Sequence, residues 1–287
     1  MVFPVAVLIW YVFFGRQDTL AVAGLMLISV ISFVDDVRNV PASLRFVIQI
    51  VAVSLLFYEI GILGYYWYWV FFAFLLTIGC INAFNFMDGI NGITTFYSLV
   101  AFGTFSLLNN YNRLLAPVFD SPAPEYWSSF LPGRLVGMVF VSLLVFSFFN
   151  ARKRAKTFAG DVGSISIAFI LSGFMISLMV MSNSFFWILL FAVYGVDAGI
   201  TILIRLRRRE NILQPHRQHL YQLLVNEYGR PHLVVAALYA VAQMVVNAIT
   251  LWLTFTGNMN LYVFLVMLTL ISATYVVIRR QVTMKTM

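Results

Sequence analysis

The stretch SISIAFILSGFMISLMVMS, residues 164–182, carries no charged side chain and is long enough to cross a membrane. About 20 apolar residues in a helix span the ~30 Å hydrocarbon core of a bilayer. Similar runs follow one another along the 287-residue chain, of which 62% is hydrophobic and only 10% charged. A soluble domain carries about a quarter charged residues. The composition therefore predicts an all-α, polytopic integral membrane protein that forms a single domain over residues 1–287.

Working outward from this run, we expect ten membrane-spanning helices. They lie at 1–14, 19–34, 46–64, 66–82, 92–109, 135–149, 164–182, 184–204, 233–256 and 261–278. Turn-forming residues separate them, and no internal repeat or low-complexity tract interrupts the pattern. Because no long polar segment remains, we expect no additional soluble domain.

The positive charges indicate how these helices are oriented. With ten spans, loops 35–45, 83–91, 150–163 and 205–232 and the C-terminal tail fall on one side. This side holds all of the 18 Lys and Arg residues except Arg16, Arg113 and Arg134. Cytoplasmic loops carry such an excess, so we place this side and the C-terminus in the cytoplasm of a bacterium, with the chain in its inner membrane. The Lys and Arg side chains then lie at the surface of the lipid bilayer, and we expect no nucleic-acid partner.

Neither cysteine chemistry nor a leader is indicated. Cys80 is the single cysteine, so no internal disulfide can form, and we interpret it as a small apolar filler. The first residues, MVFPVAVLIWYVFF, have no basic segment and no small-residue cleavage site, so a signal peptide is not expected. The run is also short for a full span, which suggests that the start lies inside a longer protein.

Acids and histidines gather on the predicted cytoplasmic side. They are Asp35, Asp36, Asp88, Asp161, Glu210, Glu227, His216 and His219. Several of the acids stand beside apolar residues, as in FVDD, NFMDG and FAGD. A loop that only solvates the end of a helix would not need a carboxylate in such a position. We therefore predict that four loops converge to form one active face.

Two of these loops have competing interpretations. The pair Asp35-Asp36 is either a solvated helix end or a site for a divalent cation, which would offset the repulsion of adjacent charges. In NAFNFMDGINGI, residues 82–93, Asn82, Asn85 and Asp88 recur every three residues and so share one helical face. A polar helix cap would explain Asp88 but not the repeated asparagines.

The third loop, RAKTFAGDVGS, ends just before a span, where backbone amides can bind an anion and Asp161 a bridging cation. Lys156 is a candidate for substrate binding, whereas Arg152 and Arg154 are adequately explained as membrane anchors.

The fourth, QPHRQHLYQLL, predicts a helix that starts at Pro215 and carries His216 and His219 on one face. Arg217 beside them favours phosphate recognition over zinc, for which no third ligand is evident. Asp197, inside a span, is either functional or paired with a cytoplasmic arginine.

Taken in order, DD, NAFNFMDGINGI, FAGDVGS and HRQHLYQ resemble the polyprenyl-phosphate N-acetylhexosamine-1-phosphate transferase family, of the glycosyltransferase family 4 type. The resemblance covers roughly residues 19–230 and includes VDAGITILIRLRR at 196–208. It implies a bundle of ten or eleven helices with a cytoplasmic site. There, undecaprenyl phosphate attacks the β-phosphate of a UDP-N-acetylhexosamine, UMP leaves, and a lipid-diphosphate sugar remains in the membrane.

The resemblance also implies roles for individual residues. Asp35 and Asp36 match an acidic pair assigned to metal binding or to activation of the lipid phosphate, and Asp161 matches the aspartate that holds Mg²⁺, which Mn²⁺ could replace. Phe158 matches an aromatic next to the uracil. The remaining candidates for substrate binding or catalysis are Asn82, Asn85, Asp88, Lys156, His216, Arg217 and His219, with His216 placed among the catalytic residues. A homodimer is the assembly to test.

The chain departs from the family pattern at three points. Asn91 stands where the family commonly has a second aspartate, FAGD replaces FMGD, and the family's first span and first cytoplasmic loop are absent before Met1. The HRQH form is more similar to the O-antigen and capsule branch than to the peptidoglycan branch. The alternatives are a catalytically inactive scaffold and, less well supported, a transporter that uses Asp197.

Overall fold

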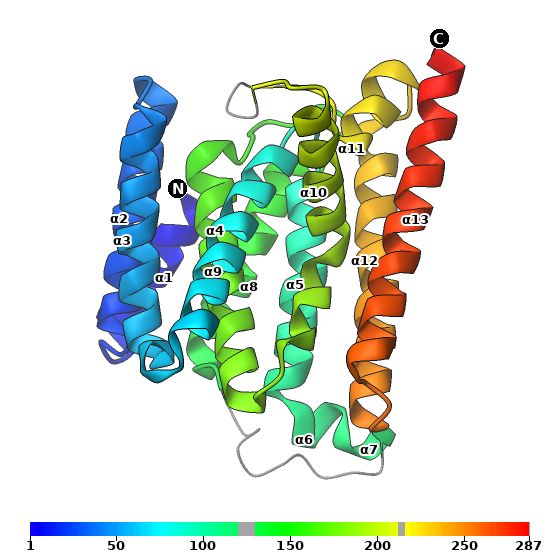
Figure 1. Ribbon diagram of the computed structural model, residues 1–287. Helices are drawn as coiled ribbons and strands as arrows, with labels where there is room; N and C mark the ends of the chain where they lie inside the picture. Colours follow the sequence, from blue (N-terminus) through cyan, green and yellow to red (C-terminus); the bar gives the residue numbers. More distant parts are fainter. Residues whose placement is uncertain (120–129, 212–215, 287) are drawn as a thin grey trace.

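The computed structural model describes residues 1–119, 130–211 and 216–286, and within these ranges it contains helices and no strand. The long helices run up and down and form a bundle (Figure 1). Eight of the described helices are long and apolar enough to cross a membrane. They are α2 (Thr19–Val37), α3 (Ala42–Ile60), α4 (Trp67–Met87), α8 (Gly133–Asn150), α9 (Gly160–Ser182), η3 with α10 (Phe185–Phe191 and Ala192–Arg207), α12 (His232–Phe255) and α13 (Leu261–Thr286).

Two shorter apolar helices complete the set, α1 (Val2–Phe14) and α5 (Ile93–Asn109). The predicted all-α polytopic membrane fold is confirmed, and each of the ten expected spans corresponds to a helix. The remaining elements are short. They are η1 (Ile62–Gly64), α6 (Tyr111–Leu114), α7 (Ala116–Phe119), α11 (Leu220–Gln222) and the π-helical turn η4 (Leu223–Glu227).

Local chemistry explains where the long helices begin and end. Pro41, Pro132 and Pro231 stand directly before α3, α8 and α12, because proline has no N–H to continue a helix upstream. Gly61 ends α3 at a φ of 82° and Asn183 ends α9 at 48°, the left-handed conformation that these two residue types favour.

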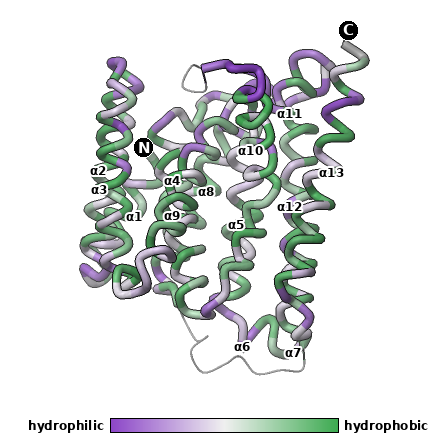
Figure 2. The backbone as a smooth tube through the Cα atoms, viewed as in Figure 1, coloured by the Kyte–Doolittle hydropathy of each residue, from purple (hydrophilic) through white to green (hydrophobic). Residues whose placement is uncertain are grey.

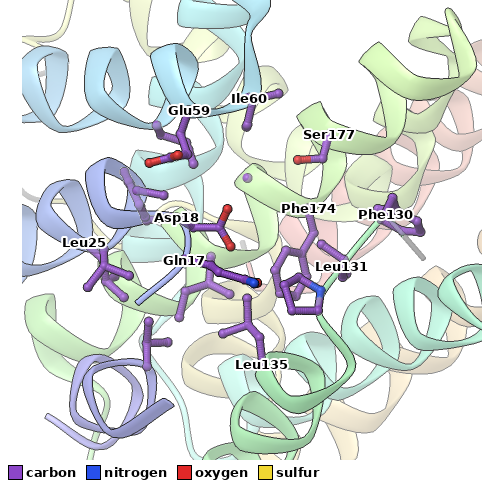
Figure 3. Close-up of a pocket in the computed structure, with 18 of the residues that line it drawn as sticks. Gln17, Asp18, Leu25, Glu59, Ile60, Phe130, Leu131, Leu135, Phe174 and Ser177 are labelled. Atoms are coloured by element: carbon purple, nitrogen blue, oxygen red, sulfur yellow. The ribbon is translucent and has the colours of Figure 1, made fainter. Parts of the chain in front are cut away.

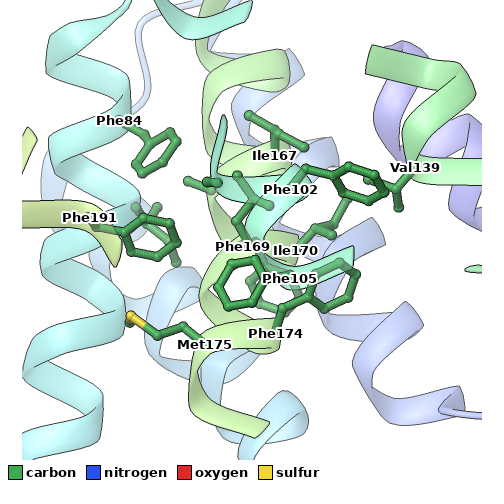
Figure 4. Close-up of a cluster of buried hydrophobic side chains, with 14 of the residues drawn as sticks. Phe84, Phe102, Phe105, Val139, Ile167, Phe169, Ile170, Phe174, Met175 and Phe191 are labelled. Carbon is green, nitrogen blue, oxygen red and sulfur yellow. The ribbon is translucent and has the colours of Figure 1, made fainter. Parts of the chain in front are cut away.

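Helix α9 lies at the centre of the bundle. Buried residues make up 78% of its most apolar window, against 6% for α13 at the periphery. Phe169 and Phe174 of α9 pack among aromatic and aliphatic side chains from α4, α5 and η3 (Figure 4). Gly24 lets α2 approach α3 closely, since a Cβ there would lie 2.6 Å from the carbonyl oxygen of Ala52. The first turn of α9 is therefore held firmly in place.

One span is not a continuous α-helix. The 3₁₀ segment η3 precedes α10, and buried Gln243 of α12 supplies hydrogen bonds at the junction. Its Oε1 accepts from the Val193 N–H at 2.9 Å, and its Nε2 donates to the Leu189 carbonyl at 2.8 Å. Tyr97 and Asn247 complete the side chain's contacts, at 2.6 Å each. The irregular backbone is satisfied by protein, as it must be where water is absent.

The loops fall at two ends of the bundle, which we name the α11 end and the α6–α7 end. The α11 end holds the connections after α2, α4, α8 and α10 together with the C-terminus (Figure 1). Hydrophilic residues concentrate there (Figure 2). The boundaries at this end differ from the expected ones. Helix α2 runs to Val37, α4 runs to Met87, and α9 starts at Gly160. Asp35, Asp36, Asn85 and Asp161 therefore lie in the ends of helices and not in loops.

Candidate active site

Four carboxylates gather at the α11 end, where α2 and α4 end and α9 begins. Asp35 and Asp36 come from the last turn of α2, Asp161 from the first turn of α9, and Asp88 ends α4. Arg45 of α3 pairs with two of them, its Nη1 lying 2.5 Å from Asp35 and 3.6 Å from Asp161. Because one arginine faces four acids, the cluster carries an excess of negative charge.

Asp36 caps the start of α9. Its Oδ1 accepts the Asp161 N–H at 3.2 Å and its Oδ2 the Val162 N–H at 3.5 Å. Gly160 has a φ of 61°, and a Cβ there would lie 3.1 Å from Asp36, so glycine permits this close approach. Our expectation that these amides bind a substrate anion is wrong, because a carboxylate of the chain already accepts from them.

Asp88 is held against the same helix start. Its Oδ1 accepts from the Thr94 hydroxyl at 2.6 Å, and the carboxylate also accepts from the Gly160 N–H. Burial raises the pKa of Asp88 to about 6, and the charge of Asp161 adds to this rise. Asp88 and Asp161 are therefore neighbouring acids whose repulsion a cation would relieve.

The two asparagines that precede Asp88 have different partners. Asn85 accepts a hydrogen bond from Ser164 of α9 at 2.7 Å, which ties α4 to the acidic cluster. Asn82 donates to Gln49 of α3 at 3.2 Å and to the Ile78 carbonyl at 2.8 Å. The structure thus brings Asn85, but not Asn82, into hydrogen bonds with α9.

Asn91 joins the loop after α4 to the loop after α8. Its side chain is 6% exposed, and Nδ2 donates to the carbonyls of Arg152 at 3.0 Å and Lys153 at 3.2 Å. Its backbone N–H donates to His232 at 3.3 Å. An aspartate could not make the two side-chain contacts, because an ionised carboxylate only accepts. The departure from the family pattern is matched by the loop that it binds.

Asn150, which the sequence did not lead us to select, makes a second tie between these loops. It is 1% exposed, its Oδ1 accepts from the Gly92 N–H and the Thr95 hydroxyl at 2.9 Å each, and Nδ2 donates to the Thr157 carbonyl at 3.0 Å. The available signal was an amide at the end of the apolar run FSFF, where a buried polar group needs partners.

The loop that follows Asn150 presents two candidate residues at the surface. Phe158 is 65% exposed although it is a large apolar side chain, and Lys156 is exposed as well. They lie within five residues of Asp161 in sequence. An aromatic ring and an ammonium group are thus available next to the acidic cluster.

The histidine segment is not the helix that we expected. His216–Gln218 is irregular, helix α11 starts only at Leu220, and His219 is its N-cap residue. Pro215, the expected start, lies outside the described residues. Two contacts explain the later start. The Leu220 N–H and the His219 ring both bond Asp197 at 3.2 Å, and this fixes the helix entrance there.

Tyr221 connects this segment to the loop after α4. Its hydroxyl donates to the Phe86 carbonyl at 2.9 Å. A Cβ added to Gly89 would collide with that hydroxyl and lie 3.1 Å from the ring, so only glycine allows the two segments to meet. Since Asp88 adjoins Gly89, the histidine segment lies beside the loop that carries Asp88, and the four loops meet at the α11 end.

The two histidines and Arg217 differ in environment. The rings of His216 and His219 lie 4.8 Å apart between centroids. Burial lowers the pKa of His216 to about 4, assisted by the positive charges of His219 and Arg205, so His216 is neutral near pH 7. Arg217 is exposed and available to an anionic ligand.

Asp197 is fully buried in α10. It bonds to the His219 ring, to the Leu220 N–H and to the hydroxyls of Thr201, Tyr239 and Tyr275. Of the two alternatives for Asp197, the ion pair with a cytoplasmic arginine is not formed within the described residues, and a histidine, a backbone N–H and hydroxyls surround the carboxylate instead. A carboxylate so fully engaged is poorly suited to carry a transported ion.

Asp88 and Asp161 are the acids of the cluster that could hold a magnesium ion. Within the described residues, no group of three His, Cys, Asp or Glu side chains is arranged to hold a metal ion. Mg²⁺ is commonly bound by only one or two carboxylates together with substrate phosphates. Asp35 is the acid nearest to Arg45 and Asp36 caps α9, which leaves Asp161, 3.6 Å from the same arginine, and its neighbour Asp88 as the candidate ligands.

A cavity of the described structure lies away from this cluster. It has a volume of about 780 Å³ and an apolar lining, with Asp18 and Glu59 at the α6–α7 end of α2 and α3 (Figure 3). Glu59 accepts the Leu20 N–H at 2.7 Å, and burial raises the pKa of Asp18, helped by the charge of Glu59. None of the predicted site residues lines this cavity.

The fold and the polar cluster together define an integral-membrane protein whose reactive groups meet at one end of a helical bundle. Comparison with known families is consistent with the motifs. The family model for glycosyl transferase family 4 matches residues 19–179, more than half of the chain, and the chain belongs to this family. The match contains the acidic cluster but ends before Asp197 and the histidine segment.

Two curated relatives illustrate the range of the family. The phospho-N-acetylmuramoyl-pentapeptide-transferase of Streptococcus equi subsp. zooepidemicus is 28% identical over 186 residues, which cover 55% of this chain and 50% of the relative. The probable undecaprenyl-phosphate N-acetylglucosaminyl 1-phosphate transferase of Bacillus subtilis is 23% identical over 265 residues, 82% of this chain and 68% of the relative. The chain spans about half the length of the first of these.

Proposed function

We propose that this chain transfers N-acetylhexosamine-1-phosphate from a UDP-sugar to undecaprenyl phosphate and releases UMP. The observation that carries the proposal is the meeting of the acidic cluster with the histidine segment at one end of a family 4 membrane bundle. The names of the two relatives support it, since both describe transfer of a phosphate-linked amino sugar unit. The product would start a lipid-linked glycan of the cell envelope.

The chemistry required is displacement at phosphorus. An oxygen of the lipid phosphate attacks the β-phosphorus of the donor, and the bond from that phosphorus to the bridging oxygen breaks, so UMP departs with the bridging oxygen. Because the attacking phosphate is already ionised near pH 7, no strong base is needed. Catalysis then rests on positioning and on neutralisation of the developing charge.

The residues of the cluster divide this work between them. Asp88 and Asp161 would hold Mg²⁺, or Mn²⁺ in its place, and the bound cation would neutralise charge on the diphosphate. Asp36 fixes the start of α9, and Arg45 holds Asp35 next to Asp161. The side chains of the cluster would thus be held in fixed positions beside the donor, which is what catalysis by positioning requires.

Exposed groups around the cluster are suited to the remaining parts of the substrates. Phe158 can stack on the uracil, and Lys156 and Arg217 can pair with phosphate oxygens. The apolar surface of the spans gives the polyprenyl chain access from the bilayer. We place the α11 end and the C-terminus on the cytoplasmic side of the inner membrane, because UDP-sugars are made in the cytoplasm.

A direct experiment can identify the sugar that is transferred and the branch of the family to which the chain belongs. The HRQH form favours the O-antigen and capsule branch, whereas the streptococcal relative acts in phospho-N-acetylmuramoyl-pentapeptide transfer by its name. The purified protein would be given undecaprenyl phosphate, Mg²⁺ and a panel of labelled UDP-N-acetylhexosamines, with UDP-N-acetylmuramoyl-pentapeptide included. Label extracted with the lipid identifies the donor.

Two variants make this experiment specific. Asp161→Asn should abolish lipid labelling, because the acidic cluster loses its central charge. Asp18→Asn is the matched control, since Asp18 is an acid at the α6–α7 end, and it should leave labelling unchanged. If no donor labels the lipid with a folded protein, the inactive scaffold becomes the better interpretation.

A further inference from the structure

Asp197 stands outside the part of the chain that the family model matches, yet it is the most heavily hydrogen-bonded carboxylate of the site region. Its Oδ2 accepts from the Tyr239 hydroxyl at 2.6 Å, and its Oδ1 accepts from Tyr275 at 3.0 Å and from the Leu220 N–H at 3.2 Å. These partners come from α12, α13 and α11. All of these partners donate, so the contacts match an ionised carboxylate, which accepts at both oxygens and has no hydrogen to place.

Arg279 of α13 supports this direction of the hydrogen bonds, in which the hydroxyls donate to Asp197. Arg279 donates to the Tyr275 hydroxyl oxygen at 2.7 Å and to the Thr201 hydroxyl oxygen at 3.0 Å. Because an arginine cannot accept a hydrogen bond, neither hydroxyl uses its hydrogen on Arg279, and each can donate to Asp197. The peripheral helix α13 is thereby coupled to a buried group of the site.

His219 is the partner on which this arrangement acts. Its ring is 1% exposed, and Nδ1 lies 3.2 Å from Asp197 Oδ1. Since Asp197 only accepts, Nδ1 must carry the hydrogen of this bond. The other ring nitrogen, Nε2, is buried and has no hydrogen-bond partner in the described structure. A buried polar atom without a partner destabilises the fold, so the retention of this one points to a ligand that bonds it.

The surroundings of the His219 ring indicate where such a ligand lies. Phe86 stacks on it with centroids 6.3 Å apart and an angle of 26°, and the His216 ring lies 4.8 Å away. Phe86 stands between Asn85 and Asp88, both of which contact the start of α9. His219 therefore borders the space beside the acidic cluster.

We propose that Asp197 is a positioning residue that fixes the Nδ1–H form of His219 and so presents Nε2 to a phosphate oxygen of the substrate. The assignment of the ligand rests on the proposed function, and the fixed ring form does not. An ionised phosphate oxygen only accepts, so in the substrate complex Nε2 carries a hydrogen as well and donates it. Asp197 itself contacts no substrate.

The ring form can be read without any activity. The chain has three histidines, so a ¹⁵N-histidine NMR spectrum of the protein in nanodiscs is simple enough to assign with His216→Gln and His232→Gln. We expect the wild-type His219 to carry its hydrogen on Nδ1, and Asp197→Asn to populate the form with hydrogen on Nε2 alone. An unchanged His219 spectrum in Asp197→Asn would overturn the proposal, as would a wild-type ring with a bare Nδ1.

Turnover then shows what the positioning does for the reaction. Asp197→Asn should lower kcat by about 10- to 100-fold, the usual cost of removing a partner that orients a functional histidine. Asn247→Leu is the control: it removes a buried amide of α12 that bonds Gln243 and Thr104, away from His219. It should lower thermal stability and leave both the His219 spectrum and kcat unchanged.

A second variant covers the case in which Asp197→Asn does not fold. Tyr275→Phe removes one donor to Asp197 and keeps the ring, and it should shift the His219 signals in the same direction with a loss in kcat below 10-fold. An undisturbed spectrum in this variant contradicts the coupling to α13. If the wild type shows the predicted ring form but no transfer, the proposed function fails while the positioning stands.

Discussion

Replacing Asn91 with the aspartate that the family pattern leads one to expect should damage this protein rather than improve it. The Asn91 amide donates to two backbone carbonyls, of Arg152 and Lys153, from a position that is 6% exposed. An aspartate would lose both hydrogen bonds and set a negative charge against two carbonyl oxygens. The substitution therefore tests whether this asparagine is a structural tie.

The magnitude follows from these contacts. Each lost hydrogen bond costs about 1 kcal/mol net, and leaving a charge buried without its partner costs about 3–5 kcal/mol. The basic side chains of Arg152 and Lys153 offset part of the charge, so we expect Asn91→Asp to lose roughly 2–5 kcal/mol. By the usual scaling this lowers the melting temperature by roughly 5–15 °C.

The assay is thermal unfolding of the detergent-solubilised protein, followed by fluorescence-detected size exclusion. Asn91→Ala is the matched control, since it removes the same donors without adding charge, and it should lose only about 1–3 kcal/mol. At pH 5 the difference in melting temperature between Asn91→Asp and Asn91→Ala should become smaller, because a protonated aspartate can donate a hydrogen bond. An Asn91→Asp protein as stable as the wild type, or more active, would refute the reasoning.

Three further predictions test other parts of the account. Gly89→Ala should displace the Tyr221 ring and cost about 1–3 kcal/mol, and adding Tyr221→Phe should recover part of that loss in a double-mutant unfolding cycle. Gln243→Leu should cost about 2–4 kcal/mol in the same unfolding assay, since it leaves the η3–α10 junction unsatisfied. The pKa of His216 is depressed in the folded state, so the folded state binds fewer protons between about pH 6.5 and 4. Its contribution to stability is therefore present above pH 6.5 and lost as the pH falls toward 4, and His216→Gln should flatten that part of the melting-temperature profile. A profile with the same slope in the variant would count against the depressed pKa.

The sequence was sufficient for the helices of the bundle, because long apolar runs are strong local signals. It was also sufficient to predict that the motifs converge. It could not show which acids are already engaged. The bond from Asp36 to the start of α9 joins residues 125 positions apart, and no local pattern reports such a contact.

In the histidine segment, a local sequence pattern predicted a helix start that the structure places later in the chain. Pro215 and the HxxH spacing are typical of a helix start, and the expected helix followed from them. The structure starts the helix later because Asp197, on another helix, accepts hydrogen bonds from His219 and the Leu220 N–H. A tertiary contact overrode a local preference, and it did so at the residues that we connect with function.

The central claim is that phosphate moves with the sugar to the lipid, and the position of a ³²P label tests it most directly. A UDP-N-acetylhexosamine that labels the undecaprenyl phosphate acceptor in the donor panel would be prepared with ³²P only in its β-phosphate. We predict that this label enters the lipid fraction while unlabelled UMP is released, and that Asp161→Asn abolishes both. Label released as UDP, with sugar alone on the lipid, would contradict the account.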